Sequence, residues 1–264
     1  MPQIELNGTS LYYEVHGTGT PIVFLHDCRS SHHMFEPQIE YFGKRSKVIV
    51  LDLRGNGQSG KMNIDIPHIL EAQCEDLQKL LNMLQVPQAV LVGYSSGGVL
   101  AQKFAALYPE RVKALVLVDC LFESILYAKG KSLWELIEPL AWVTWYLPAE
   151  FFLRSLRVTY NRWLPAYSIL RNEILHKRPT EAIKQRLALR QANMFKDLAK
   201  LKVPMLCVAG SQNEWGLKQM NQASAMLPLA QFAILKDAFY PSHLCQPHSF
   251  NRLLLNYLID HQLV

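Results

Sequence analysis

One short motif in this chain has the residue types and spacing that nucleophilic catalysis requires. Residues 93–97 read GYSSG, which matches G-x-S-x-G, and they lie between an apolar run at 89–92 and a helical pattern at 99–107. The turn leaves no room for side chains at the two glycines, and it lifts the central serine above the end of the strand. Ser95 is therefore the predicted nucleophile, and the backbone N–H of Ser96 is one predicted donor to an oxyanion.

The elements that would position this serine are strands buried on both faces. Four runs rich in Val, Ile and Leu, without polar alternation, have that character, and they span residues 22–25, 48–51, 89–92 and 114–118. Between them, residues 69–84 carry apolar side chains at the three- and four-residue spacing of a helix. Strand–helix alternation of this kind predicts a doubly wound, mostly parallel sheet.

The alternation begins with a hairpin and is later interrupted. An Asn7-Gly8 pair between two strand-like runs predicts an antiparallel hairpin at the start of the chain. From about residue 121 to 197 the sequence is mostly helical and rich in aromatic residues, and strand-like sequence then resumes. We expect a core made of 1–120 and 198–264, with a helical cap inserted at 121–197.

Three further motifs accompany the serine motif. The sequences FLHD at 24–27, DLRGNGQS at 52–59 and YPERV at 108–112 resemble the His-Gly oxyanion segment, the D-x-R-G-x-G-x-S loop and the segment after the elbow helix of the α/β-hydrolase superfamily. The resemblance runs along nearly the whole chain. It implies an α/β-hydrolase fold, with a mostly parallel sheet of about eight strands and an inserted helical cap. The superfamily includes esterases, lactonases, lyases, cyclases and receptors, so the fold alone does not give the function.

The position of the catalytic acid departs from the family pattern. In the family this acid commonly follows the seventh strand, at a position that Asn213 occupies here. An amide cannot offset the imidazolium charge that forms during acyl transfer. Glu214, one residue later, could substitute if the loop is re-aimed. Asp119, at the end of the sixth strand, is the other candidate, because some members place the acid there; the alternative is that it caps the turn into the cap.

The position of the catalytic base also departs from the pattern. The family's histidine stands seven residues before a proline, and counting back from Pro247 reaches Tyr240. A tyrosine with its ordinary pKa of about 10 is a poor base at neutral pH. His243 could replace the missing histidine if its loop swings to Ser95. The alternative is a histidine at the surface or at a helix start.

The oxyanion segment carries a third departure. Asp27 follows His26, where the family usually has glycine. A carboxylate close to a developing oxyanion opposes it unless the carboxylate is protonated or turned away. If the chain is a hydrolase, the backbone N–H groups of Ser96 and Asp27 are the expected oxyanion donors.

The aromatic residues of the cap predict an apolar lid over a pocket. Four of the five tryptophans lie within residues 121–197. Aromatic side chains at helical spacing also pack simply between helices, so only those that point inward would meet a ligand. The aromatic residues that we expect at the pocket are Tyr94, Trp134, Trp142 and Trp145.

Composition argues against several other classes of function. The net charge of +5 is spread along the chain, which is unlike the basic stripe of a nucleic-acid-binding protein. The five cysteines are odd in number and widely scattered, so we expect buried thiols instead of a zinc site or disulfide framework. No segment stays apolar over the roughly 18 residues that crossing a bilayer needs. We therefore expect a soluble, cytoplasmic protein without cofactor or metal, whose partner is a small hydrophobic molecule.

The sequence leaves three functions open. The first is hydrolysis of a hydrophobic ester, lactone or thioester by Ser95, with His243 as base and one of the two acid candidates orienting it. The second is a non-hydrolytic reaction, such as a cyclisation, elimination or isomerisation, in which Tyr240, Asp27 or Ser95 donates hydrogen bonds or moves protons. The third is a silent ligand-binding protein. The many hydrolases in the superfamily favour the first.

Overall fold

The runs rich in Val, Ile and Leu form one eight-stranded sheet in the computed structural model, which describes residues 3–120, 144–190 and 201–264. The strands are β1 (Gln3–Leu6), β2 (Thr9–His16), β3 (Pro21–Leu25), β4 (Lys47–Leu51), β5 (Ala89–Tyr94), β6 (Val112–Val118), β7 (Met205–Gly210) and β8 (Ala230–Leu235). Their order across the sheet is β1-β2-β4-β3-β5-β6-β7-β8. The pairs β1–β2 and β2–β4 are antiparallel, and the other five are parallel. The predicted α/β-hydrolase sheet is confirmed.

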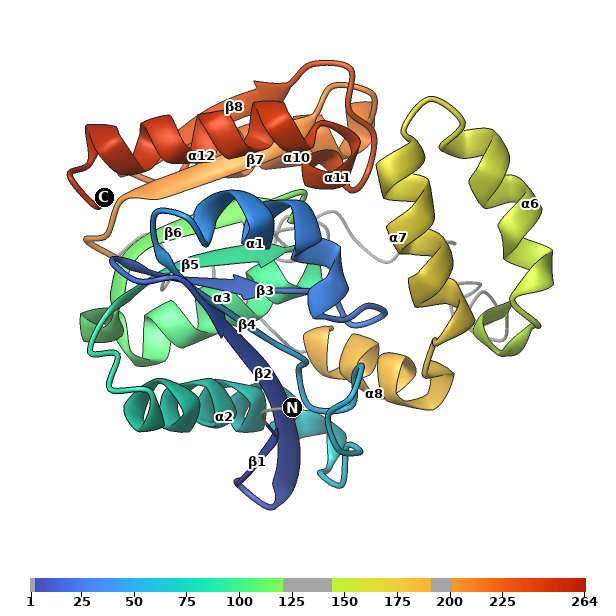
Figure 1. Cartoon of the computed structure of the whole chain (residues 1–264), viewed down its shortest axis with the longest axis horizontal. Coiled ribbons are helices and arrows are strands. Elements are labelled where there is room, and N and C mark those ends of the chain that lie inside the picture. Colours follow the sequence, from blue (N-terminus) through green and yellow to red (C-terminus); the bar gives the residue numbers. More distant parts are fainter. Residues whose placement is uncertain (1–2, 121–143, 191–200) are drawn as a thin grey trace.

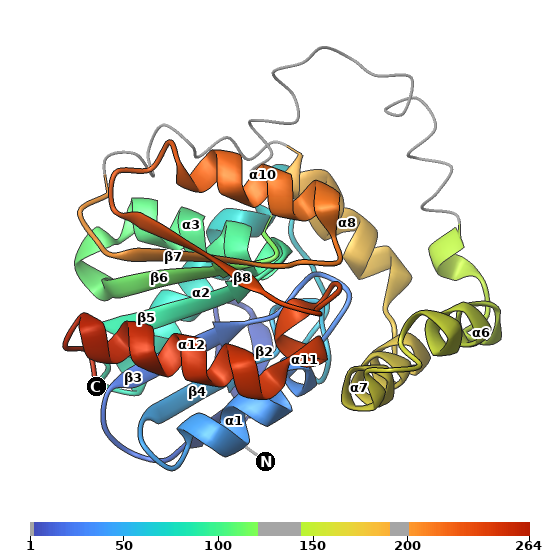
Figure 2. The same cartoon turned by 90° about the horizontal axis from the view of Figure 1, so that it is seen from above.

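Helices cover both faces of the sheet (Figures 1 and 2). On one face lie α2 (Ile69–Met83), α3 (Ser96–Leu107) and α10 (Glu214–Ser224), and on the other lie α1 (Glu36–Phe42) and α12 (Pro247–Asp260). The short elements are η1 (His32–Phe35), η2 (Ile66–His68), η3 (Pro109–Arg111) and α11 (Ser242–Cys245). The chain enters α3 directly after Ser95, three residues earlier than the helical pattern of the sequence predicts, so the serine stands at the N-terminal end of a helix.

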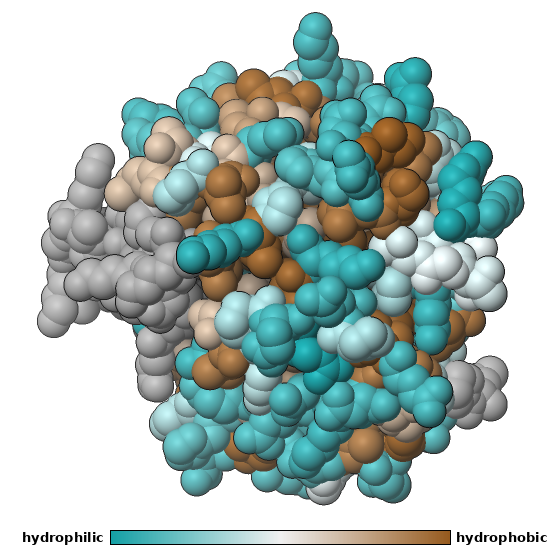
Figure 3. Space-filling model, turned by 90° about the vertical axis from the view of Figure 1, so that its left-hand side faces the viewer, coloured by the Kyte–Doolittle hydropathy of each residue, from teal (hydrophilic) through white to brown (hydrophobic). Residues whose placement is uncertain are grey.

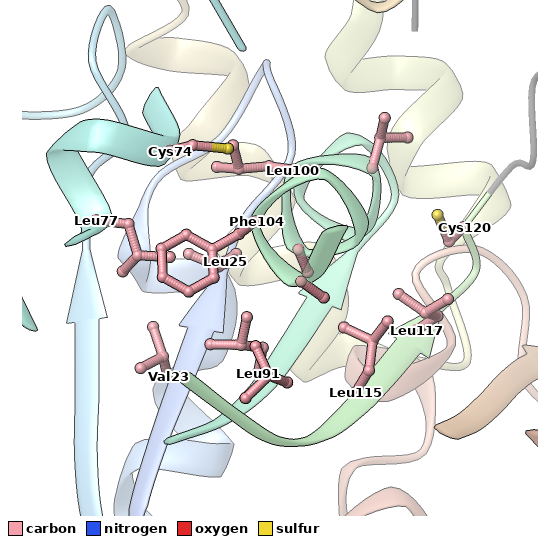
Figure 4. Packing of buried hydrophobic residues seen from close by; sticks show 14 of the residues in the cluster. Val23, Leu25, Cys74, Leu77, Leu91, Leu100, Phe104, Leu115, Leu117 and Cys120 are labelled. Atoms are coloured by element: carbon pink, nitrogen blue, oxygen red, sulfur yellow. The ribbon is translucent and has the colours of Figure 1, made fainter. Parts of the chain in front are cut away.

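The core between the sheet and α2 and α3 explains the apolar strands. Figure 4 shows Leu77 of α2 and Phe104 of α3 directed toward Leu91 on the sheet. All three side chains are fully buried. A strand that is covered by helices on both faces has no solvent-facing side for polar residues, which is why the strands lack alternation. This packing holds β5 and α3 together, and the Ser95 turn joins them.

The described part of the interval 121–197 is helical. It contains η4 (Thr144–Tyr146), α6 (Glu150–Thr159), α7 (Leu164–Leu175) and α8 (Pro179–Leu189). The Ser31 hydroxyl donates to the Glu173 carboxylate of α7 at 2.7 Å, and the Met62 N–H donates to the Glu181 carboxylate of α8 at 3.1 Å. These bonds attach α7 and α8 beside the carboxyl ends of the parallel strands, where sheets of this class bind ligands. Residues 121–143 and 191–197 of the predicted cap lie outside the described residues.

The surface away from α6 and α7 is mixed in character. Figure 3 shows hydrophilic side chains interspersed with hydrophobic ones on that face. In the described ranges, none of the helices combines the length and the apolar character needed to cross a membrane.

Replacing Phe104 tests the packing under the serine turn. Phe104→Ala should lower the free energy of unfolding by about 3–5 kcal/mol, because it leaves a cavity between α3 and the sheet. Leu107→Ala on the same helix is the matched control, since Leu107 is 46% exposed whereas Phe104 is fully buried. Urea unfolding monitored by circular dichroism measures both. Equal losses in the two variants would contradict the packing described.

Candidate functional site

The Ser95 turn has the geometry of a nucleophile elbow. Ser95 adopts φ 53° and ψ −119°, a conformation that side-chain-bearing residues rarely take. A Cβ on Gly93 would lie 2.5 Å from the Gly97 carbonyl oxygen, and one on Gly97 would lie 2.1 Å from the Leu25 carbonyl oxygen. Only glycine fits these approaches, so the two glycines allow the turn that presents Ser95 at the end of β5.

The Ser95 hydroxyl is in contact with Tyr240. The Tyr240 hydroxyl donates to Ser95 Oγ at 2.6 Å. Burial and the negative charge of Asp27 raise the pKa of Tyr240 well above its ordinary value, and Tyr94 shares a side-chain hydrogen bond with Tyr240. At neutral pH Tyr240 is therefore a protonated donor, whereas a catalytic base must accept the proton of the serine.

Asp119 holds the loop that carries Tyr240. Its carboxylate accepts the Ser242 N–H at 2.6 Å and the Gly210 N–H at 3.3 Å, so it links the ends of β6 and β7 to this loop. Burial raises the pKa of Asp119 to about 6. The structure thus gives this acid candidate two backbone partners from distant segments, and the turn into the cap that it was expected to cap lies outside the described residues.

His243 lies in a different direction from Ser95. It is completely buried at the start of α11, and its Nε2 hydrogen-bonds to the Met34 carbonyl oxygen at 3.2 Å. Its ring packs against Phe35, Tyr94 and Phe250. Burial lowers the pKa of His243 to about 3, so the ring is neutral. The structure does not bring this predicted base to the serine, and it places the histidine inside the protein instead of at the surface.

The third and fourth residues after β7, Asn213 and Glu214, also have local roles. Asn213 caps α10, where its side-chain oxygen accepts the Gly216 N–H at 3.1 Å. Glu214 is exposed in the first turn of the same helix, where a negative charge complements the helix dipole. Neither side chain has a hydrogen bond or ion pair with Ser95, Asp119 or Tyr240 within the described ranges.

The oxyanion segment is held in place by hydrogen bonds. The Cys28 N–H donates to the Ser96 hydroxyl at 2.7 Å, so this donor beside the elbow is already occupied. Asp27 is buried, and its Oδ1 accepts the Ser30 hydroxyl at 2.7 Å and the Arg29 N–H at 3.1 Å. His26 is fully buried, and its Nε2 accepts the Leu53 N–H at 2.9 Å. The predicted segment therefore contains a fixed carboxylate and a structural histidine.

A cavity of about 250 Å³ opens beside the Ser95–Tyr240 pair. The structure places the predicted pocket residues Asp27, Tyr94 and Trp145 on its wall, together with Tyr240 from the position of the base. Much of the remaining wall is apolar, and α6 and α7 contribute Phe152, Leu156, Leu170 and Ile174 to it. We call this space the apolar cavity. Trp134 and Trp142 lie outside the described residues.

One acidic residue on the wall of the apolar cavity was not predicted from the sequence. Glu173 of α7 is 8% exposed and accepts the Ser31 hydroxyl. Burial raises the pKa of Glu173 to about 7, and the charges of Asp27 and Asp52 add to this effect. A signal was present, because Glu173 follows the apolar residues Ala166 and Leu170 at the four- and three-residue spacing of one helical face.

The titratable residues of the described chain are not grouped for a metal. Nowhere in 3–120, 144–190 and 201–264 do three or more His, Cys, Asp or Glu side chains converge as ligands. The adjacent His32 and His33 instead pair with separate carboxylates, Asp52 at 2.8 Å and Glu36 at 2.7 Å.

Comparisons with known proteins agree with this geometry at the level of the fold. Residues 16–231 match the family model described as alpha/beta hydrolase fold. Of the solved structures, a thermophilic esterase from Thermogutta terrifontis superposes with a TM-score of 0.83 at 24% identity, over 99% of both chains.

Two curated relatives illustrate the range of similarity. The AB hydrolase superfamily protein YisY from Bacillus subtilis (strain 168) is 27% identical over 88% of this chain and 90% of its own length. The putative carbamate hydrolase RutD from Azorhizobium caulinodans is 34% identical, but that match spans 45% of this chain and 44% of RutD. These relatives carry hydrolase names, which supports a protein of the α/β-hydrolase type.

The raised pKa of Glu173 predicts a pH dependence of stability. The folded protein holds this proton up to about pH 7, whereas the unfolded chain loses it near the ordinary pKa of 4.5. The free energy of unfolding should therefore fall as the pH rises through this window. The free energy of unfolding should differ by roughly 3 kcal/mol between pH values below and above this window.

Glu173→Gln should remove this part of the pH dependence. Asp119, whose pKa is raised to about 6, acts in the overlapping lower part of the window and remains in the variant. Urea unfolding of both proteins from pH 4.5 to 7.5 gives the difference that belongs to Glu173 alone. Parallel curves for the two proteins would show that Glu173 does not bind its proton as described.

Proposed function

This chain belongs to the alpha/beta hydrolase fold family, and from that premise and the contacts of Ser95 we propose that it is an enzyme that moves protons on a small, largely apolar carbonyl compound. The reaction does not pass through an acyl-serine. Tyr240 is the hydrogen-bond donor to the carbonyl oxygen, and Glu173 is the base. The substrate occupies the apolar cavity, whose wall includes both residues.

The contact between Tyr240 and Ser95 carries this proposal. At 2.6 Å, the tyrosine hydroxyl occupies the position from which a base would have to take the serine proton. Its raised pKa keeps it protonated, so it cannot accept that proton at neutral pH. His243 is turned to the Met34 carbonyl oxygen. Ser95 thus has the elbow of a nucleophile without a base at its hydroxyl.

The same pair can polarise a carbonyl group. When Ser95 turns to donate its proton to the Tyr240 oxygen, Tyr240 is free to donate its own proton into the cavity. Hydrogen bonds in such a chain strengthen one another, and they act more strongly in an apolar site than in water. This role gives a reason for a serine at the elbow that does not involve acyl transfer.

Glu173 has the properties of a general base. Its pKa of about 7 places it near the working pH, where it can both accept and release a proton. Asp27 raises the pKa of Glu173 and that of Tyr240 through its negative charge. A raised-pKa tyrosine and a carboxylate in one apolar cavity suit proton abstraction next to a carbonyl group.

The proton transfer balances without a further reactant. The C–H bond beside the carbonyl breaks, its proton moves to the Glu173 carboxylate, and its electron pair forms the C=C bond of an enolate. The enolate oxygen accepts the hydrogen bond from Tyr240. Return of the proton to another carbon completes an isomerisation, and departure of a leaving group completes an elimination.

Hydrolysis through Ser95 is the second candidate. The intact elbow favours it, with the two glycines and the strained backbone of Ser95, and so do the hydrolase names of the relatives. It requires a base to reach Ser95 after Tyr240 moves away.

Deuterium exchange tests the proposed reaction. Small apolar ketones, lactones and esters in D2O should take up deuterium at the carbon beside the carbonyl, as followed by proton NMR. Glu173→Gln should slow this exchange by about 100-fold or more, and Tyr240→Phe by about 100- to 1,000-fold, because it removes the donor to the enolate. Glu214→Gln, an exposed acid outside the cavity, is the control. Equal exchange in wild type and Glu173→Gln would refute the assignment of the base.

A fluorophosphonate probe separates the two candidates. We expect no adduct on the wild-type protein, because no base removes the Ser95 proton. Tyr240→His should gain an adduct, which should disappear in the Tyr240→His/Ser95→Ala double variant. Intact-mass spectrometry detects the adduct in the wild type and in both variants. A Ser95-dependent adduct on the wild type would instead favour hydrolysis.

A further inference from the structure

A second cavity adjoins the apolar one and has a different character. Its volume is about 340 Å³, and its wall includes His32, His33 and Asp52. We call it the polar cavity. Five residues line both cavities, namely Arg29, Ser30, Glu173, Lys177 and Arg178. We call these five side chains, three of which are cationic, the junction of the two cavities.

Most charges around this junction are already paired. Asp52 Oδ1 lies 2.8 Å from His32 Nδ1, and this contact raises the pKa of His32. Asp27 Oδ2 lies 3.7 Å from Arg29 Nε. Asp52 lines only the polar cavity and Asp27 only the apolar one, so with these two paired, Glu173 is the carboxylate at the junction itself.

A second set of pairs lies at the edge of the polar cavity. His33 Nδ1 lies 2.7 Å from the carboxylate of Glu36. His176, also on the wall, hydrogen-bonds through Nδ1 to the Asn172 carbonyl oxygen at 3.0 Å. The Cys28 thiol has a pKa raised to about 11 by burial and is neutral. None of these groups supplies a further negative charge to the junction.

Two cations at the junction have no carboxylate partner within the described ranges. Lys177 Nζ donates to the Leu147 carbonyl oxygen and lies 4.7 Å from the centre of the Phe152 ring. Arg178 Nη1 donates to the Ser59 carbonyl oxygen at 2.8 Å. Glu173, four residues before Lys177 in the chain, is partly protonated near pH 7. The junction therefore carries excess positive charge.

A helix begins directly after the two cations. α8 begins at Pro179, directly after the two cations, and Pro179 and Ala182 line the apolar cavity. The N-terminal end of a helix carries a partial positive charge and favours anions. The first turn of α8 also carries Glu181, whose carboxylate accepts the Met62 N–H, so the excess positive charge of the junction comes from Lys177 and Arg178.

We propose that the substrate is amphipathic, with an apolar body in the apolar cavity and an oxyanion, a carboxylate or phosphate, held by Lys177 and Arg178 at the junction. The proposal deepens the proposed function, on whose cavity it rests. A fixed anion at this place orients the molecule along the cavity, so that its carbonyl group faces Tyr240. Arg178 can bind two oxygen atoms through its planar guanidinium group, and Lys177 acts as a point charge.

Binding of a matched set of short-chain ligands tests this proposal. The probes are hexanoate, hexyl phosphate, methyl hexanoate and hexylamine, titrated by calorimetry into the whole chain at pH 7. We expect at least one of the two anions to bind about tenfold or more tightly than the ester and the amine. Hexanoate against hexyl phosphate distinguishes a carboxylate site from a phosphate site. Equal affinity for the anion and the ester, or no binding of either anion, would overturn the proposal.

Variants assign the binding to the two cations. Lys177→Gln and the Lys177→Gln/Arg178→Gln double variant should lose the preference for the anion and keep the affinity for the ester, and Lys177→Arg should retain the preference. Lys184→Gln is the matched control, because Lys184 also donates to a backbone carbonyl, that of Met62, but lines neither cavity. Circular dichroism checks that each variant folds. If the double variant is unstable, the Lys177→Gln single variant gives the result. An unchanged anion preference in folded Lys177→Gln would overturn the proposal.

The binding test is independent of the chemistry. Deuterium exchange can fail while hexanoate still binds through Lys177, and this outcome would remove the proposed reaction but leave the anion site. Exchange on neutral ketones without any anion preference would remove the anion site but leave the proposed reaction. The two proposals therefore fail separately.

Discussion

The close packing of backbone at the Ser95 turn is the constraint on which the rest of the site depends. Gly97 lies so near the carbonyl oxygens of Leu25 and His26 that a Cβ would overlap both. This approach joins the end of β3, which leads to Asp27, to the start of α3. It also holds Ser95 in a strained backbone conformation, which persists because the surrounding packing leaves no alternative. The serine, the oxyanion segment and the wall of the cavity are therefore placed together.

The chemistry available at this turn depends on which group contacts the Ser95 hydroxyl. In this chain it is a protonated phenol, and the loop that carries it is held by the buried carboxylate of Asp119 through backbone N–H groups. Asp119 thus acts on the position of the loop, whereas a catalytic acid would act on a histidine. Beside the elbow, the Ser96 hydroxyl accepts a hydrogen bond from the Cys28 N–H.

Electrostatics link the two cavities. Asp27 contributes to the raised pKa of Tyr240 and of Glu173, so one fixed charge keeps a donor and a base in suitable protonation states. The same charge is paired with Arg29, which leaves Lys177 and Arg178 to act on a ligand. A carbonyl group near Tyr240 and an anion near Lys177 are then two ends of one molecule. The proposed reaction and the proposed substrate class follow from a single distribution of charge.

The sequence by itself determined the sheet and the elbow, because these rest on local patterns. Apolar runs without alternation suit strands covered on both faces, and G-x-S-x-G requires glycine at two tight approaches. Counting back from Pro247 also indicated which residue stands at the position of the base, and Tyr240 does contact Ser95. Only the tertiary structure decided where His243 points, since its partner, the Met34 carbonyl oxygen, is 209 residues away in sequence. The same holds for Glu173, whose neighbours Ser31, Asp27 and Asp52 come from other segments, because a pKa depends on burial and charges that no local pattern records.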